Sequence, residues 1–162
     1  RRTGSIEILS TLPIHPRQII LGKWLAAVAM VSVALCLTLT YPIALSMLGE
    51  LDWGPVLGGY FGLLLMGATF AAIGLATSAV SRFQLVSFLM ATVICGLPWA
   101  FGFVLGSFSA EWVNTVQYLT FNYHFNNLAI GTLDSRSLIF FFSVIAISLE
   151  IAAFALQRRR LV

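Results

Sequence analysis

The chain has little charge for its length. Of its 162 residues, 9 are Lys or Arg and 6 are Asp or Glu, so that charged residues make up only 9%. A soluble domain carries about 25% charged residues, which it needs to cover its surface with groups that water solvates. An apolar fraction of 59% and a mean hydropathy of +0.95 instead place the chain in a lipid bilayer.

The sequence also lacks the motifs of nucleotide sites, metal sites and hydrolases. Gly22 and Lys23 do not form a phosphate-binding loop, because the upstream glycine and the following Ser or Thr are missing. Cys36 and Cys95 lie inside apolar runs without metal-ligand spacing, and we expect two small buried side chains there. We therefore expect no catalytic residue, no metal and no cofactor. The few basic residues flank apolar runs, which argues against a nucleic-acid partner.

Four apolar stretches have the length of membrane spans. A helix needs about 20 apolar residues to cross the hydrocarbon core, and only helices or closed barrels satisfy their backbone there. The stretches are 19–47, 56–80, 85–105 and 138–156. We predict an all-α polytopic membrane protein, a single domain over residues 1–162 with four transmembrane helices and with membrane lipid around it.

The basic residues predict the orientation. Eight of the nine precede the first stretch or lie near its start, separate the second from the third, or follow the fourth, and an even number of spans places all eight on one side. By the positive-inside rule this side is the cytoplasm. We therefore expect a multi-pass protein of the inner (cytoplasmic) membrane with both ends of this chain in the cytoplasm.

The second stretch carries small residues at helical spacing. Gly58 and Gly62 form a GxxxG motif, and Gly67 with Ala71 continues the pattern. Small residues let helix backbones approach closely in lipid. Packing within the chain and packing against a second copy of the protein both fit this pattern, and so does a role along a substrate path.

Three further features interrupt the apolar stretches. Pro42 and Pro98 predict kinks near the outer ends of the first and third spans. Glu150 lies within the fourth span near its cytoplasmic end, where a carboxylate is costly unless it is paired or hydrated. We expect it to pair with the basic tail or with Lys23, the alternative being a place on the substrate path.

The longest connection, 107–137, is amphipathic and rich in aromatic residues. It is too polar to span, and aromatic side chains of this kind favour the headgroup region. We predict one or two short interfacial helices on the outer side, partly re-entrant. Asp134 with Ser135 predicts the N-cap of the fourth transmembrane helix.

The first 24 residues form a basic, half-apolar segment that suits a helix at the membrane surface. They resemble the cytoplasmic loop of ABC-2-type transporter permeases. The positions that fit its pattern are Arg2, Gly4, Glu7, Leu9, Pro13, Ile14, Ile19, Gly22 and Lys23. The segment before the last span is similar to that of the gliding-motility-associated permease subfamily, at His124, Phe125, Gly131 and Asp134, and the basic ending Arg158–Arg160 fits as well.

This resemblance implies a six-helix permease, of which the chain, beginning at Arg1, would supply the last four helices and the loop before them. Residues 1–18 would form the cytoplasmic coupling loop, with a coupling helix at about Ser5–Leu12 seated on a separate ATPase subunit that binds the ATP. The residues of this interface would be Gly4, Glu7, Leu9, Pro13 and Lys23. Two permeases and two ATPase subunits would form a transporter, in the favoured case an exporter. The alternative is a non-transporting scaffold or anchor subunit of a membrane complex.

Overall fold

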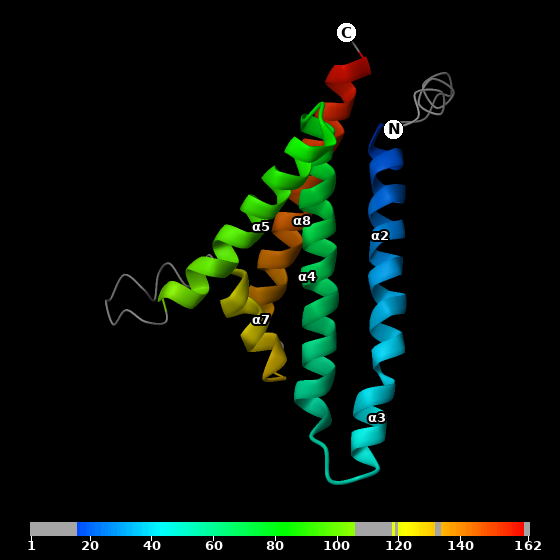
Figure 1. Ribbon diagram of the computed structural model, residues 1–162, viewed down its shortest axis with the longest axis vertical. Coiled ribbons are helices and arrows are strands. Elements are labelled where there is room, and N and C mark those ends of the chain that lie inside the picture. The colour runs from blue at the N-terminus through cyan, green and yellow to red at the C-terminus, as the bar shows by residue number, and fades with distance from the viewer. Residues whose placement is uncertain (1–15, 106–117, 119, 132–133, 161–162) are drawn as a thin grey trace.

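The computed structural model describes residues 16–105, 118, 120–131 and 134–160. In these residues every regular element is an α-helix, which confirms the predicted all-α class. The helices are α2 (Pro16–Thr38), α3 (Thr40–Ser46), α4 (Trp53–Val80), α5 (Gln84–Leu105), α7 (Phe121–Ala129) and α8 (Ser135–Arg160) (Figure 1).

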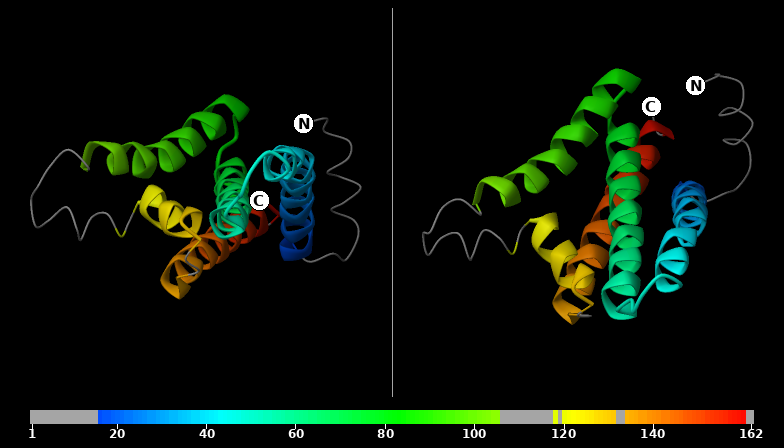
Figure 2. Two further views of the ribbon diagram at one scale, coloured as in Figure 1. Left: turned by 90° about the horizontal axis from the view of Figure 1, so that it is seen from below. Right: turned by 60° about the horizontal axis from the view of Figure 1, so that its bottom comes forward.

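Helix α4 is the centre of the bundle. It contacts α2, α5, α7 and α8, and its packing against α8 is the most extensive in the described residues. Seen from below, α2 lies on one side of α4, and α5 and α7 lie on the other (Figure 2). Helix α5 runs obliquely away from the end of α4, and α7 lies between these two helices (Figure 1).

Small side chains explain why α4 and α8 lie so close. Ala72 and Ala76 of α4 are buried, as are Ala152 and Ala153 of α8. Helices in lipid associate by van der Waals packing, and alanine lets two backbones approach closely. The bulkier Ile145 fills the space next to Ala72 further along the interface.

The first predicted span is divided in two. Helix α2 ends at Thr38 and α3 begins at Thr40. The Leu39 N–H bonds at 3.2 Å to the carbonyl of Cys36, three residues back, whereas a regular α-helix would use the carbonyl four residues back. Pro42 has no N–H to donate to the Thr38 carbonyl, and its ring crowds that group, so the regular helix breaks there. The kink predicted at Pro42 is confirmed. Helix α5, in contrast, continues through Pro98.

Three helices of the described residues are long and apolar enough to cross a membrane, at Pro16–Ser46, Trp53–Val80 and Ser135–Arg158. The apolar part of α5, Gln84–Ala100, is shorter, and a fourth span stays a prediction. Large apolar side chains such as Met30, Leu37 and Phe88 face outward. Such a surface suits acyl chains and would be costly in water.

Most of the described basic residues gather at one end of the bundle, the exception being Arg136 at the start of α8. The start of α2, the turn from α4 to α5 and the end of α8 all lie there (Figure 1). We call this the basic end and define it by Arg17, Arg82 and Arg158. The connection between α7 and α8 lies at the opposite end, where Gly131 adjoins Gly54 at the start of α4.

Candidate functional site

An ion pair joins the first and last helices at the basic end. Arg17 Nη2 of α2 donates to Glu150 Oε2 of α8 across 3.0 Å. The partner of Glu150 is thus Arg17, and the expectation of Lys23 or the basic tail was wrong. The two side chains are 70% and 63% exposed, and a pair so open to solvent contributes about 0.2–1 kcal/mol. The pair ties the start of α2 to the part of α8 near its end.

The predicted coupling residues Gly4, Glu7, Leu9 and Pro13 lie outside the described residues, as does the predicted helix at about Ser5–Leu12. Lys23, the last residue of that set, is exposed on α2. A cavity of about 620 Å³ lies between the start of α2 and the end of α8, and Pro16 lines it together with the Arg17–Glu150 pair. The chain therefore enters α2 beside this cavity.

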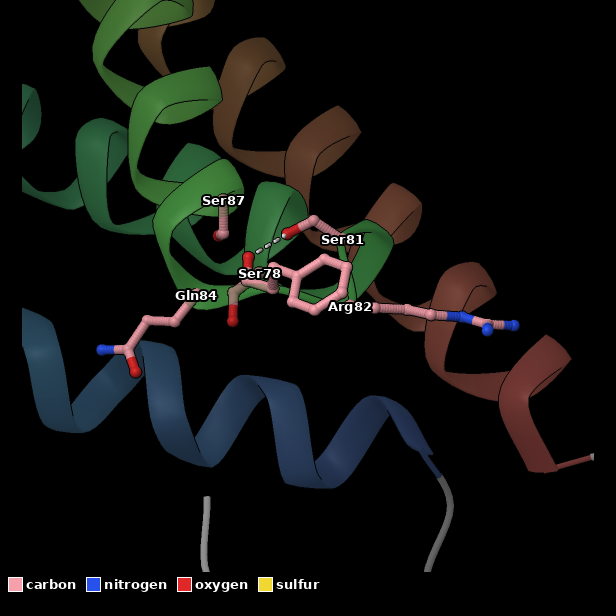
Figure 3. A pocket seen from close by; sticks show the side chains of 6 residues that line it. Ser78, Ser81, Arg82, Gln84 and Ser87 are labelled. Atoms are coloured by element: carbon pink, nitrogen blue, oxygen red, sulfur yellow. Dashed lines mark hydrogen bonds between the residues drawn. The ribbon is translucent and has the colours of Figure 1, made fainter.

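A second cavity, of about 410 Å³, lies at the turn from α4 to α5. Figure 3 shows its side chains, and its lining consists of Ser78, Ser81, Arg82, Phe83, Gln84 and Ser87. Ser81 Oγ donates to the Thr77 carbonyl at 3.1 Å, and the Ser87 and Thr77 hydroxyls lie 3.5 Å apart. These hydroxyl groups satisfy the end of α4 and hold the turn to α5, which is a local structural role.

The glycines of the second predicted span pack inside the chain. A Cβ at Gly58 would collide with the backbone of α7 at the Leu128 carbonyl oxygen and would lie 2.9 Å from the Gly131 Cα. A Cβ at Gly62 would lie 3.3 Å from Leu128 Cβ, and one at Gly67 would lie 2.9 Å from a methyl group of Val31 on α2. Gly58 and Gly62 therefore face α7, and Gly67 faces α2.

A buried histidine joins α7 to α8. His124 is 5% exposed, and its Nδ1 lies 3.1 Å from Ser137 Oγ while its Nε2 lies 2.9 Å from the Tyr118 carbonyl oxygen. The ring stacks on Phe140 with the centroids 4.2 Å apart. A carbonyl only accepts, so Nε2 carries the proton and Nδ1 accepts from the Ser137 hydroxyl. Both ring nitrogens are thus satisfied when the ring is neutral.

In the described residues, the acidic side chain of Asp134 caps a helix and does not belong to a cluster of metal ligands. No three His, Cys, Asp or Glu side chains among the described residues lie together as a metal site requires. Asp134 Oδ1 accepts from the Arg136 N–H at 3.0 Å, which confirms the predicted N-cap of α8. Polar groups in this part of the chain therefore serve helix ends and helix contacts.

The fold and these contacts can be set beside known proteins. A family model described as ABC-2 family transporter protein matches residues 1–159. The chain belongs to the ABC-2 transporter family. Neither the search of curated proteins nor the search of solved structures finds a match. As an ABC-2 family member with long apolar helices, the chain is a membrane-integral permease, and its family implies an ABC ATPase as partner.

In this ABC-2 permease the sequence predicted the basic end but not the contacts that organise it. Arg17 and Glu150 are 133 positions apart, so no local pattern pairs them. The bond from Trp24 Nε1 to the Ala68 carbonyl, 2.9 Å long, was missed for the same reason. His124 was singled out by resemblance, but its partner Ser137 could be found only by docking α7 on α8.

Acidification is expected to destabilise this ABC-2 permease through His124. Burial lowers the pKa of His124 below its ordinary value of 6.5, against smaller opposing effects of the Tyr118 carbonyl and Asp134. Because the folded state binds the proton less readily than the unfolded chain, His124 favours folding above pH 6.5, and this contribution is lost as the pH falls through the lowered pKa. The melting temperature at about pH 5 should fall below that at about pH 7.5. This difference should be smaller in His124→Gln than in the wild type.

The chain supplies a matched control for this experiment. His15→Gln removes its other histidine by the same substitution, and its melting temperature should keep the wild-type dependence on pH. A dependence that is unchanged in His124→Gln and weakened in His15→Gln would contradict the assignment.

Proposed function

We propose that the chain is the permease subunit of an ATP-driven ABC-2 exporter and that residues 1–18 couple it to a separate ATPase subunit. The family match over residues 1–159 carries this proposal. The chain has no phosphate-binding loop of its own, so that ATP would be bound and hydrolysed by the partner. The concentration of basic residues at one end supports a cytoplasmic location for that end in the inner membrane.

The contacts at the basic end provide a route for the motion. Arg17, near the end of the proposed coupling loop, is bonded to Glu150 of α8. Helix α8 in turn packs along α4 through alanines, and Trp24 ties α2 to α4. Close-packed helices move as rigid bodies, so a displacement of the loop would be passed to α2, α4 and α8 together.

The proposed transporter contains a second permease copy that completes the substrate path. The Gly58–Gly62 face is occupied by α7 and the Gly67 position by α2, so these glycines serve the fold of each copy. The pairing of Glu150 with Arg17 supports a role in positioning helices over a role along the path.

Co-purification with the ATPase subunit tests the coupling loop. A Glu7→Arg, Leu9→Asp variant reverses one charge and buries another in the proposed interface, and we expect it to retain about tenfold less ATPase than the wild type. The matched control, Leu48→Asp with Glu50→Arg, makes the same two substitutions at the same spacing between α3 and α4, at the other end of the bundle. It should retain ATPase as the wild type does.

Equal retention of the ATPase by wild type and coupling variant would show that the coupling loop is assigned wrongly. The alternative, a non-transporting scaffold, would bind the ATPase without changing its turnover. ATP hydrolysis that rises in proteoliposomes when candidate cargo is supplied separates a transporter from that scaffold.

A further inference from the structure

A groove at the basic end is lined by two arginines and by apolar side chains. It has a volume of about 830 Å³ and lies between the end of α4 and the end of α8. Its lining consists of Ala79, Val80, Arg82, Ile151, Phe154, Ala155 and Arg158. None of the glycine contacts described above lies in this groove.

The two arginines of this groove have no carboxylate partner among the residues that the structure describes. Glu150 is the one described carboxylate near this end, and it is bonded to Arg17. Neither Arg82 nor Arg158 forms an ion pair with any described residue. Figure 3 shows Arg82 extending away from Gln84 and Ser87. As far as the described part of the chain shows, the groove therefore presents two positive charges without a paired carboxylate.

One of these charges is already held in place. The Arg158 guanidinium carbon lies 4.6 Å above the centre of the Phe154 ring. A guanidinium stacked on an aromatic face keeps its N–H groups directed outward in its own plane, and less side-chain freedom is lost when they bind an anion. Two oxygens of one phosphate fit such a planar donor.

The walls between the arginines are apolar and open. Val80 is 53% exposed, Ile151 is 47% exposed and Phe154 is 58% exposed. All three belong to helices that are apolar enough to cross a membrane, and they lie at the ends of those helices. A free phosphate ion would leave these walls uncovered, whereas a lipid would cover them with its acyl chains.

We propose that this groove binds an anionic phospholipid of the surrounding membrane. Arg82 and Arg158 hold the phosphate of its headgroup. The acyl chains lie along Val80, Ile151 and Phe154. A zwitterionic lipid fits less well, because its ammonium group meets the same two positive charges. Basic pockets between membrane helices suit such headgroups, because their positive charge lies at the depth of the headgroup layer.

Lipid retention measured by native mass spectrometry tests the proposal. The full permease, purified in a neutral detergent without ATPase, is mixed with equal amounts of phosphatidylglycerol and phosphatidylethanolamine of the same acyl chains. The wild type should retain phosphatidylglycerol preferentially. Arg82→Gln and Arg158→Gln should each reduce its retention about fivefold, and the double variant should lose the preference.

Lys23→Gln is the matched control, because it removes one positive charge from exposed α2 outside the groove. Its retention of phosphatidylglycerol should stay at the wild-type level. If Lys23→Gln loses as much phosphatidylglycerol as the arginine variants do, the lipid is attracted to the basic end in general, and the assignment of the groove as the site is overturned. Competition by millimolar inorganic phosphate would show a site for free anions and overturn the lipid assignment.

Phe154→Leu separates charge from shape, since it keeps both arginines and removes the ring under Arg158. It should reduce retention less than the double arginine variant does, and a loss equal to that of the double variant would overturn the role of the two charges. The assay contains no ATPase, so its result is independent of the coupling experiment, and either proposal can fail alone.

Discussion

A Gly58→Ala substitution is expected to lower the free energy of unfolding by about 2 kcal/mol, although alanine favours a helix over glycine. The reason is that the added methyl group meets backbone atoms, the Leu128 carbonyl oxygen and the Gly131 Cα, which have no rotamer to change. Gly131 itself has φ +87°, a backbone conformation that favours glycine, so a compensating substitution at Gly131 would be strained. Helix α7 would have to leave α4.

Gly59→Ala is the control, one residue further along the same helix. A Cβ at Gly59 would have no atom within 4 Å, so that the helix preference of alanine should stabilise the protein by up to about 1 kcal/mol. Thermal unfolding in detergent micelles measures both variants against the wild type. Equal melting temperatures for the two variants would contradict the close contact between α4 and α7.

An Ala152→Leu substitution is expected to separate α8 from α4 and to cost about 3 kcal/mol. Ala152 is completely buried, and its cluster contains Ala76 of α4. Three additional carbon atoms have no space between two backbones that lie this close. If α4 and α8 carry the motion from the basic end, stimulation of the ATPase partner by this variant should be lost as well.

Ala146→Leu is the matched control on the same helix, at an exposed position. It places the same side chain against lipid and should leave the melting temperature within about 1 °C to 2 °C of the wild type. An Ala152→Leu variant as stable as Ala146→Leu would show that α4 and α8 are not packed as described.

The helices could be predicted from the sequence because their signal is local. Apolar runs of membrane length leave the backbone no alternative to a helix, and proline marks the break before α3. The gathering of Arg17, Arg82 and Arg158 at one end follows from the charges and an even number of spans. Asp134 was predicted as an N-cap because capping depends on its neighbours alone.

The faces of the helices could not be predicted in the same way. The Gly58–Gly62 pattern indicates that another helix approaches closely, but it does not identify that helix. Both α7 and a helix of a second copy are compatible with the pattern. A clear division into a polar and an apolar face would have shown which face of α2 or α8 is buried, but helices in lipid are apolar on all sides. The pairs Arg17–Glu150 and His124–Ser137 depend on how these faces meet.

The packing of α8 on α4 has a consequence for how the protein is made. Helix α4 ends at Val80 and its main partner begins at Ser135, so α4 enters the membrane before the helix that covers it has been synthesised. During that interval we expect Ala72 and Ala76 to face acyl chains. An alanine surface is neutral toward lipid, whereas a polar one would bind wrong partners at that stage. We therefore expect the same small residues that bring the finished helices together to leave α4 without a strong binding surface until α8 is made.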